Sequence, residues 1–252
     1  MAEKIYKIGN KILKIGGNLL TVSAGGPTPP PTPVLPDYTI RLKYEEGFTP
    51  TFSKGTGVQV SSSPNIWDLT YQNSDWSQLL ISHTSLLEVI DANSTGVSTV
   101  SNMFNNCTSL TSVPLFDTSS VTNMAAMFNR CSSLTSVPLF DISSVTNMAD
   151  MFANCYSLTS VPLFNTSSAT SMYDMFGNCS SLTSVPLFDT SSVTNMNYMF
   201  YNCPKVESGA LALYQQASTQ ATVPSHSRAF RNCGRDTVTG AAELAQIPSG
   251  WK

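Results

Sequence analysis

Hydrophobic and polar positions recur with a fixed 24-residue period through the middle of the chain. A Met-Phe pair occurs five times, and a Cys follows three residues after each Phe, at Cys107, Cys131, Cys155, Cys179 and Cys203. Self-similarity at such a period is typical of a solenoid. Because one unit is too small to bury its own apolar face, neighbouring units must stack and share a core. The sequence therefore predicts stacked repeats over residues 85–203, with units that begin near Ser85.

Each repeat has two halves. The segment 110–116, Leu-Thr-Ser-Val-Pro-Leu-Phe, predicts a short strand with Leu110, Val113 and Leu115 as core positions. The next four residues, Asp-Thr-Ser-Ser, are typical helix N-caps. The apolar residues from Val121 to Cys131 then follow at spacings of three or one, which indicates a helix or a tight 3₁₀ turn. We therefore expect an α/β solenoid with short parallel strands and short helical turns.

The first segment, residues 1–24, contains two apolar-basic heptads separated by Gly-Asn and Gly-Gly. This pattern favours short strands and turns that bury little surface by themselves. We interpret the segment as an arm that becomes ordered on a partner, and a loose tail is the alternative. The expected anchor residues are Ile5, Tyr6, Ile8, Ile12, Leu13 and Ile15. Residues 25–36 are rich in proline and predict a semi-rigid spacer after the arm.

The flanks of the repeats are expected to cap the solenoid. Residues 37–84 look β-rich, because Tyr38–Tyr44 alternates with period two and Val58–Val60 resembles another strand. We favour core packing for Trp67 and Trp76, and carbohydrate stacking by either residue is the alternative. Residues 204–252 break the period, since the interval from Cys203 to Cys233 is longer than the interval between the other cysteines. Helices over 209–220 and 241–246 would then form a helical C-terminal cap.

Composition narrows the functional classes. Charged residues make up 12% of the chain, and the net charge is −3. The chain therefore lacks the excess of basic residues that is typical of a nucleic-acid-binding protein. No apolar run has the length of a signal peptide or a membrane span, so no membrane insertion is expected. Because the chain begins with Met, we expect a complete protein that is cytosolic or is released by cell lysis.

Candidate chemistry is sparse. The cysteines occupy one repeated position, which favours a column of small buried thiols over disulfides or metal ligands. His83 and His226 lie outside the repeats, and no catalytic motif accompanies them. Asp117, Asp141 and Asp189 form a row with Asn165 that would bind Ca²⁺ or cap the helical turns, and capping is favoured. We therefore expect no enzyme, no metal and no cofactor.

The string Met-Phe-x-Asn-Cys-x-Ser-Leu-Thr-Ser-Val resembles the BspA-like class of leucine-rich repeats. Five of six units have Asn before Cys, whereas Arg130 precedes Cys131. The Val-Thr-Asn-Met-x-x-Met-Phe part resembles repeats of bacterial surface lipoproteins. The resemblance covers about residues 85–203 and 229–233, and it implies a right-handed leucine-rich-repeat-like solenoid and a surface protein for adhesion. The arm and spacer differ from bacterial members, which usually carry a secretion signal and a wall or membrane attachment, and this layout looks like that of phage structural proteins.

Differences between the repeats suggest where a ligand would bind. They are concentrated at positions 125–126 and 129–130 and their equivalents in later units, and the candidate contact residues are Arg130, Tyr156, Tyr173, Tyr198 and Tyr201. Tyr and Arg are favoured in binding hot spots, although neutral drift on a solvated face explains the same variation. A rival is the row of Thr-Ser pairs at 111–112, 135–136, 159–160 and 183–184, which would present hydroxyls to a glycan or to ice.

These features predict a non-enzymatic binding module on the surface of a virion, in a fibre or decoration protein. Residues 1–24 would contact other virion structural proteins, and the solenoid would bind a cell-surface or mucosal glycan or protein, with homo-oligomers adding avidity. The alternative is a bacterial cell-surface or cytosolic protein-interaction scaffold unrelated to virions. A purely structural decoration without a receptor is a third hypothesis.

Overall fold

The computed structural model describes residues 5–8, 11–14 and 38–252. The chain divides into two units, residues 1–34 and 35–252. In the first unit, β1 (Ile5–Ile8) pairs antiparallel with β2 (Lys11–Lys14), and Ile5 lies opposite Lys14. The side chains of the predicted anchor residues Ile5, Tyr6, Ile8, Ile12 and Leu13, and all of Ile15, lie outside the described part of the chain, as does the predicted spacer 25–36.

The second unit begins with a four-stranded antiparallel sheet of order β4-β5-β3-β6. Its strands are β3 (Thr39–Tyr44), β4 (Thr56–Ser62), β5 (Asn65–Thr70) and β6 (Leu86–Asn93). The period-two pattern of the sequence forms β3, which buries Ile40, Leu42 and Tyr44. Trp76 is fully buried and Trp67 packs against the core, so the packing interpretation of these residues is confirmed.

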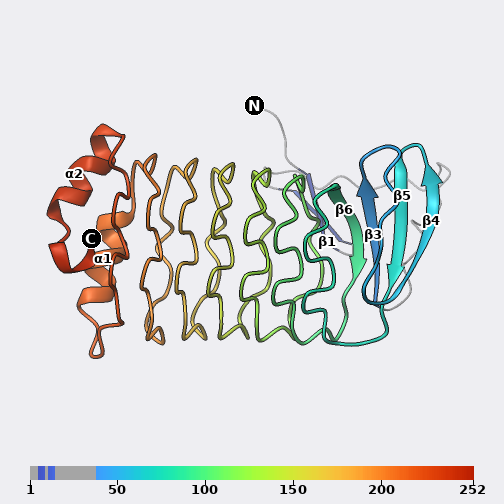
Figure 1. Ribbon diagram of the computed structural model, residues 1–252. Coiled ribbons are helices and arrows are strands. Elements are labelled where there is room, and N and C mark those ends of the chain that lie inside the picture. The colour runs from blue at the N-terminus through green and yellow to red at the C-terminus, as the bar shows by residue number, and fades with distance from the viewer. Residues whose placement is uncertain (1–4, 9–10, 15–37) are drawn as a thin grey trace. The chain divides into compact units, whose positions relative to one another are not determined.

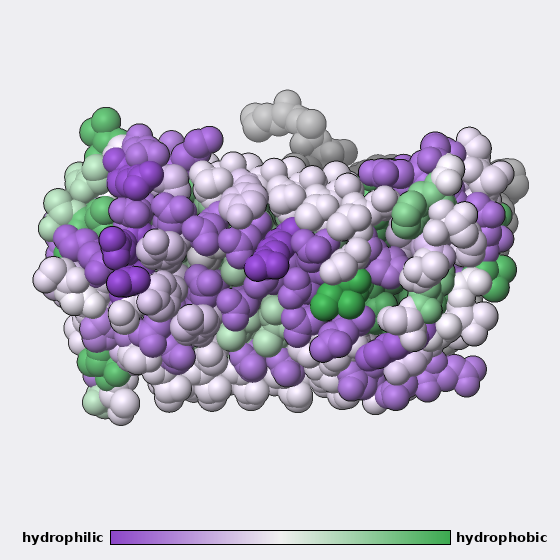
Figure 2. Space-filling view, viewed as in Figure 1, coloured by the Kyte–Doolittle hydropathy of each residue, from purple (hydrophilic) through white to green (hydrophobic). Residues whose placement is uncertain are grey.

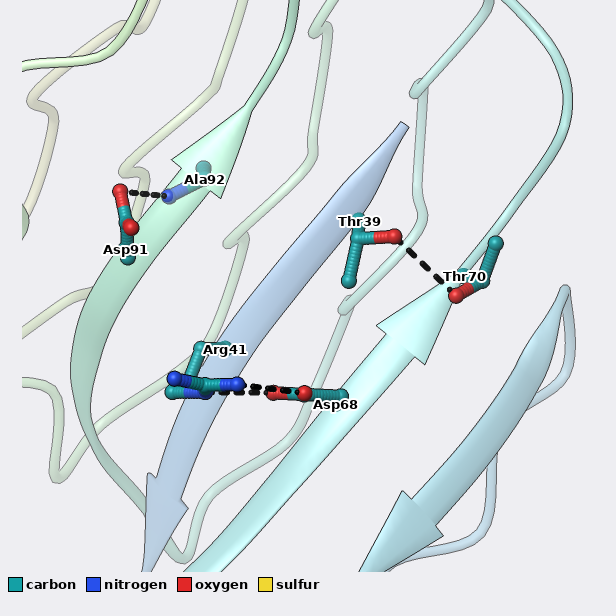
Figure 3. Close-up of polar contacts among 6 residues, drawn as sticks. All are labelled: Thr39, Arg41, Asp68, Thr70, Asp91 and Ala92. Carbon is teal, nitrogen blue, oxygen red and sulfur yellow. Dashed lines mark hydrogen bonds and ion pairs between the residues drawn. The ribbon is translucent and has the colours of Figure 1, made fainter. Parts of the chain in front are cut away.

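A charged pair crosses this sheet between β3 and β5. Arg41 donates from Nε and Nη2 to the two carboxylate oxygens of Asp68, both at 2.7 Å (Figure 3). Asp91 on β6 is the partner of Arg41 across the other strand pair. The hydrogen bond with Asp68 is the main reason why the pKa of Arg41 is raised, so the guanidinium stays charged between two acidic strands.

The repeats stack as successive rungs between β6 and the C-terminal helices, in a solenoid-like arrangement (Figure 1). The N–H groups of Val100, Asn102 and Phe104 donate to carbonyls of the next rung at 3.1, 2.8 and 2.9 Å. The N–H groups between them bond within the rung, as from Met103 to the carbonyl of Val100. Successive N–H groups therefore bond alternately to the next rung and within their own rung. These backbone groups find partners without a regular helix or strand.

The predicted helical turns are wrong. Each rung contains two residues with positive φ, four positions apart, and such residues cannot continue a right-handed helix. The pairs are Gln78 and Ser82, Asn102 and Asn106, Ala126 and Arg130, Asp150 and Asn154, Asp174 and Asn178, Tyr198 and Asn202, and Arg228 and Asn232. The second position of each pair precedes the Cys or its equivalent. The recurrent Asn-Cys is thus explained, because Asn tolerates the left-handed conformation.

The predicted short strands are also wrong in part. The segment 110–116 forms no extended strand, and only single parallel bridges such as Glu88 to Ser112 join its neighbours. Leu115, expected in the core, is exposed, whereas Phe116 is buried. Pro114 offers no N–H to a ladder, so strict alternation fails here. The inward residues are therefore Leu110, Val113 and Phe116, three positions apart.

The core of the rungs consists of columns of equivalent residues, several of them identical from rung to rung. Phe128, Phe152 and Phe176 are fully buried and stack with ring centroids 5.6 and 5.4 Å apart. All six cysteines are buried and free. The Sγ of Cys155 donates to the carbonyl oxygen of Phe128 in the preceding rung at 3.1 Å, and four other cysteines make the same bond. A small thiol fits this position because it both packs and donates weakly.

The rungs extend beyond the predicted start at Ser85. Leu79, Leu80 and His83 lie one repeat period before Met103, Phe104 and Cys107, and the N–H of Leu80 donates to the carbonyl of Met103 at 3.0 Å. His83 therefore occupies the cysteine position of a degenerate first rung, where its Nδ1 lies 2.6 Å from Tyr44 Oη. The substitution of every motif residue concealed this rung in the sequence.

At the other end, the last rung is separated from its predecessor by an inserted helix, α1 (Ala210–Ser218). Phe230 still stacks on Phe200, with centroids 6.0 Å apart. Helix α2 (Val238–Gln246) and the 3₁₀ helix η1 (Ser249–Trp251) follow. The N–H of Phe230 donates to the carbonyl of Trp251 at 2.9 Å, so the chain end covers donors that a further rung would otherwise satisfy.

Arg130 provides a test of the left-handed positions. Its φ is +63°, and the corresponding residues Asn154, Asn178 and Asn202 form a ladder of side-chain amides with N–O distances of 3.1 Å. We expect Arg130→Asn to raise the free energy of unfolding by about 0.5–1 kcal/mol, because Asn accepts this conformation more readily. Urea denaturation would measure the change. Arg130→Lys should leave stability unaltered, and a less stable Asn variant would contradict the explanation.

Candidate functional site

Three tyrosines and one arginine gather where the most variable turns of neighbouring rungs meet. The rings of Tyr173 and Tyr198 lie 5.8 Å apart, and those of Tyr198 and Tyr201 lie 5.7 Å apart, both edge to face. The guanidinium carbon of Arg228 lies 5.7 Å from the centre of the Tyr198 ring. We call these four residues the aromatic patch. Edge-to-face rings and a cation over one of them preorganise the patch for contact.

The backbone beneath the patch is strained at two of its residues. Tyr198 has φ +61° and Arg228 has φ +56°. The equivalent residues of the other rungs are Gln78, Asn102, Ala126, Asp150 and Asp174. A bulky residue in the left-handed region costs on the order of 1 kcal/mol or more, and such outliers gather at functional sites. Tyr198 and Arg228 therefore cost some stability compared with Asn at the same position.

A pair of carboxyl groups lies beside the patch. Asp150 and Asp174 occupy equivalent positions of neighbouring rungs and share a side-chain hydrogen bond. Partial burial, together with the charge of Asp150, raises the pKa of Asp174 to about 7. Gly177 makes room for this side chain, because a Cβ there would lie 1.7 Å from Asp174 Oδ1. Burial and then the charges of Asp174 and Asp150 also raise the pKa of Tyr173, the residue that precedes Asp174 in the chain.

The structure brings together three of the five predicted contact residues. Tyr156 is exposed elsewhere, where its hydroxyl lies 3.4 Å from Asn154 Oδ1, and Arg130 is exposed on an earlier rung. Arg228 was missed. It follows Tyr198 by more than one repeat period, because α1 is inserted between the two rungs. The Arg228-x-Phe-Arg-Asn-Cys spacing was the signal that could have located it.

The other predicted arrays serve the fold. The hydroxyls of Thr159 and Thr183 donate to backbone carbonyls one rung earlier at 3.3 and 3.1 Å, which reduces their use as an array for glycans or ice. Asp117 Oδ1 accepts hydrogen bonds from Ser119 N and Oγ at 3.0 and 2.6 Å. The helix-capping prediction is therefore wrong, since these are turns without a helix. Among the described residues, no three His, Cys, Asp or Glu side chains are grouped to hold a metal ion.

The thiols and histidines are poorly placed for chemistry. Burial raises the pKa of Cys107, Cys155 and Cys203 to about 12, so their reactive thiolate is scarce at neutral pH. The ring of His226 stacks on that of Trp251 with centroids 3.9 Å apart, and burial lowers the pKa of His83.

The helices of the described segments fall short of the length and hydropathy that crossing a bilayer requires. On the face shown in Figure 2, hydrophilic residues predominate over the rungs, and hydrophobic areas there are small and separate.

Two family models match parts of the chain. Residues 79–187 match a model described as Mycoplasma protein of unknown function, DUF285. Residues 149–250 match a model described as BspA type leucine rich repeat region, with six copies. No curated protein and no solved structure matches significantly. The second match supports the resemblance of the repeats to the BspA type, and repeats of this type suggest a surface protein-interaction module.

Proposed function

We propose that this chain is a non-enzymatic binding module displayed on a surface, and that the aromatic patch contacts a cell-surface or mucosal glycan or protein. The observation that carries the proposal is the position of Tyr198. Its ring contacts two further tyrosines and lies under Arg228, although its backbone has the left-handed conformation that disfavours an aromatic residue. Rigid aromatic and arginine side chains are the commonest hot-spot residues.

The chemistry of the patch suits a polyhydroxylated ligand or a protein loop. Tyrosine rings supply apolar faces at low entropic cost, and their hydroxyls supply donors and acceptors. Arg228 adds a fixed fork of donors, and the Asp150–Asp174 pair adds acceptors beside Tyr173. A single patch of this size would bind weakly, so several copies on one particle or cell would provide the avidity.

The same proposal assigns residues 1–24 as the anchor and residues 25–36 as the spacer that projects the rungs. The particle would be a virion, where the arm contacts other structural proteins. The bacterial cell surface is the alternative, and a match to a family described as a Mycoplasma protein of unknown function is compatible with a bacterial source. Electron microscopy of the protein in its native source distinguishes the two. Density for residues 1–24 on assembled virions supports the first, and cell-surface labelling without particles supports the second.

Substitution of Tyr198 tests the patch. We expect Tyr198→Asn to weaken binding to intact target cells or a glycan array by about tenfold or more, because it removes the central ring. The same change should leave the melting temperature equal or higher, because Asn accepts the left-handed conformation. Tyr156→Ser, at an exposed tyrosine outside the patch, is the matched control. Equal loss of binding in both variants, or in neither, would count against the patch.

A further inference from the structure

An apolar row runs along the rungs on the segment that carries Val-Pro-Leu-Phe. Leu115, Leu139, Leu163 and Leu187 occupy the same position of consecutive rungs and are 65%, 58%, 62% and 53% exposed. We call these residues the leucine row. Rungs joined by backbone hydrogen bonds lie about 4.8 Å apart, so the row is a continuous stripe roughly 14 Å long. None of the four belongs to the aromatic patch.

The repeats themselves indicate that these leucines serve something outside the chain. Other exposed residues that recur in the rungs make hydrogen bonds within the chain. For example, the Thr183 hydroxyl donates to the Thr159 carbonyl, and the Asp189 carboxylate accepts from the Ser191 N–H. The leucines have no comparable role. Buried positions have nevertheless drifted, as where Val121 is replaced by Ala169 or Thr118 by Ile142. Recent duplication of the repeats therefore does not by itself explain why all four exposed positions carry leucine.

The row has an acidic border. Asp117, Asp141 and Asp189 are exposed two residues after Leu115, Leu139 and Leu187. The only cation between residues 107 and 204 is Arg130, which lies on the turns of the opposite half of the repeat. The stripe is also finite. Asp91 of β6 stands one rung before Leu115, and after Leu187 the chain enters α1 instead of another Val-Pro-Leu-Phe segment.

We propose that the leucine row and its acidic border bind a basic amphipathic helix of a partner protein. Apolar residues on one face of a helix recur about every 5.4 Å along its axis. That rise nearly matches the rung spacing, so three helical turns cover four leucines. An extended strand fits less well, because its same-face side chains recur at about 6.8 Å. Lysine or arginine on one flank would face the Asp row, whereas a second copy of this chain would bring two acidic rows together.

The test uses a synthetic 18-residue peptide with leucines at i, i+4, i+7 and i+11 and lysines along one flank, and a matched peptide with glutamates in place of the lysines. Fluorescence anisotropy with the full chain should show saturable binding of the lysine peptide only. The double variant Leu139→Ser/Leu163→Ser should weaken that binding at least tenfold. The triple variant Asp117→Asn/Asp141→Asn/Asp189→Asn should reduce its dependence on salt, and Asn165 shows that this turn accepts asparagine.

Circular dichroism would establish that these surface variants remain folded. Tyr198→Asn should bind the lysine peptide as the unmodified chain does, so failure of this proposal is distinguishable from failure of the aromatic patch. Equal binding of the two peptides, or unchanged binding by the leucine double variant, would overturn the proposal. A concentration-dependent dimer that the leucine double variant abolishes, measured by analytical ultracentrifugation, would also overturn it by assigning the row to a second copy.

Discussion

Phe152→Ala is expected to lower the free energy of unfolding by about 3–5 kcal/mol, the largest effect of any single change considered for this protein. Phe152 is fully buried in the middle of the phenylalanine column and stacks on Phe128 and Phe176 with ring planes 4° and 12° apart. Its ring centroid also lies 6.5 Å from that of Phe164, the buried phenylalanine that ends a Val-Pro-Leu-Phe segment. Removing the ring leaves a cavity that the rungs above and below cannot fill, because each rung is held at its spacing by backbone hydrogen bonds.

Urea denaturation followed by circular dichroism would measure this loss. A native domain has only about 5–15 kcal/mol of stability, so the variant should unfold at a much lower denaturant concentration. The damage should also spread, since each rung is stabilised mainly by its neighbours. Leu163→Ala is the control, because Leu163 belongs to the next Val-Pro-Leu-Phe segment but is exposed, and it should change stability by less than about 0.5 kcal/mol. A loss below about 1 kcal/mol for Phe152→Ala would mean that the column is not the core.

Asp174→Asn is expected to stabilise the protein at pH 8 and to have little effect near pH 4. Burial and the neighbouring Asp150 raise the pKa of Asp174 to about 7 in the folded chain, compared with about 3.8 in a free side chain. The folded chain therefore binds this proton more tightly than the unfolded chain. The associated stability is fully present below about pH 4 and is lost as the pH rises through 7.

The size of this effect is smaller than the pKa shift alone would suggest, because solvent reaches the pair. We expect a gain of about 1–2 kcal/mol at pH 8 for Asp174→Asn. Asparagine suits the positive φ of this residue, +49°, and its amide can donate to Asp150. Thermal unfolding at pH 4, 6 and 8 would measure the change, and the unmodified chain should become less stable across this range relative to the variant.

Asp189→Asn provides the control of opposite sign. The Ser191 hydroxyl and N–H lower the pKa of Asp189, so its carboxylate stabilises the fold above the unfolded pKa and loses this contribution as the pH falls. The variant should therefore gain nothing at pH 8. If Asp174→Asn also gained nothing at pH 8, the two carboxyl groups of Asp150 and Asp174 would not share a proton in the folded chain.

The candidate site was predicted only in part, for identifiable reasons. Variation between the repeats selected Tyr173, Tyr198 and Tyr201, which the structure groups. The same criterion selected Tyr156 and Arg130, because it measures change and not proximity. Arg228 escaped because an inserted helix shifted its register, and the stacking of Phe230 on Phe200 shows the alignment of the two rungs. The Asp150–Asp174 pair became apparent only when the stacked rungs placed the two carboxyl groups close together.

The sequence alone determined the period, the stacking of units and the identity of the buried columns. Met, Phe and Cys recur at fixed positions because burial selects residue type, and burial leaves a mark that a single chain can show. The Asn before five of the six cysteines likewise marked a left-handed backbone, although its meaning was not evident in advance.

Only the tertiary structure decided how each rung follows its path. Apolar spacings of three residues suit a helix and a chain of tight turns equally well, since both place such residues on one side. The choice depends on where the backbone donors go, and here alternate N–H groups bond to the next rung, which no helix permits. In the Val-Pro-Leu-Phe segment, Pro114 has no N–H for a ladder, so strict alternation fails and Leu115 is exposed whereas Phe116 is buried. Local pattern therefore indicated most of the buried residues, whereas the folded rungs decided the backbone conformation, the inward side of the Val-Pro-Leu-Phe segment and the surfaces available to partners.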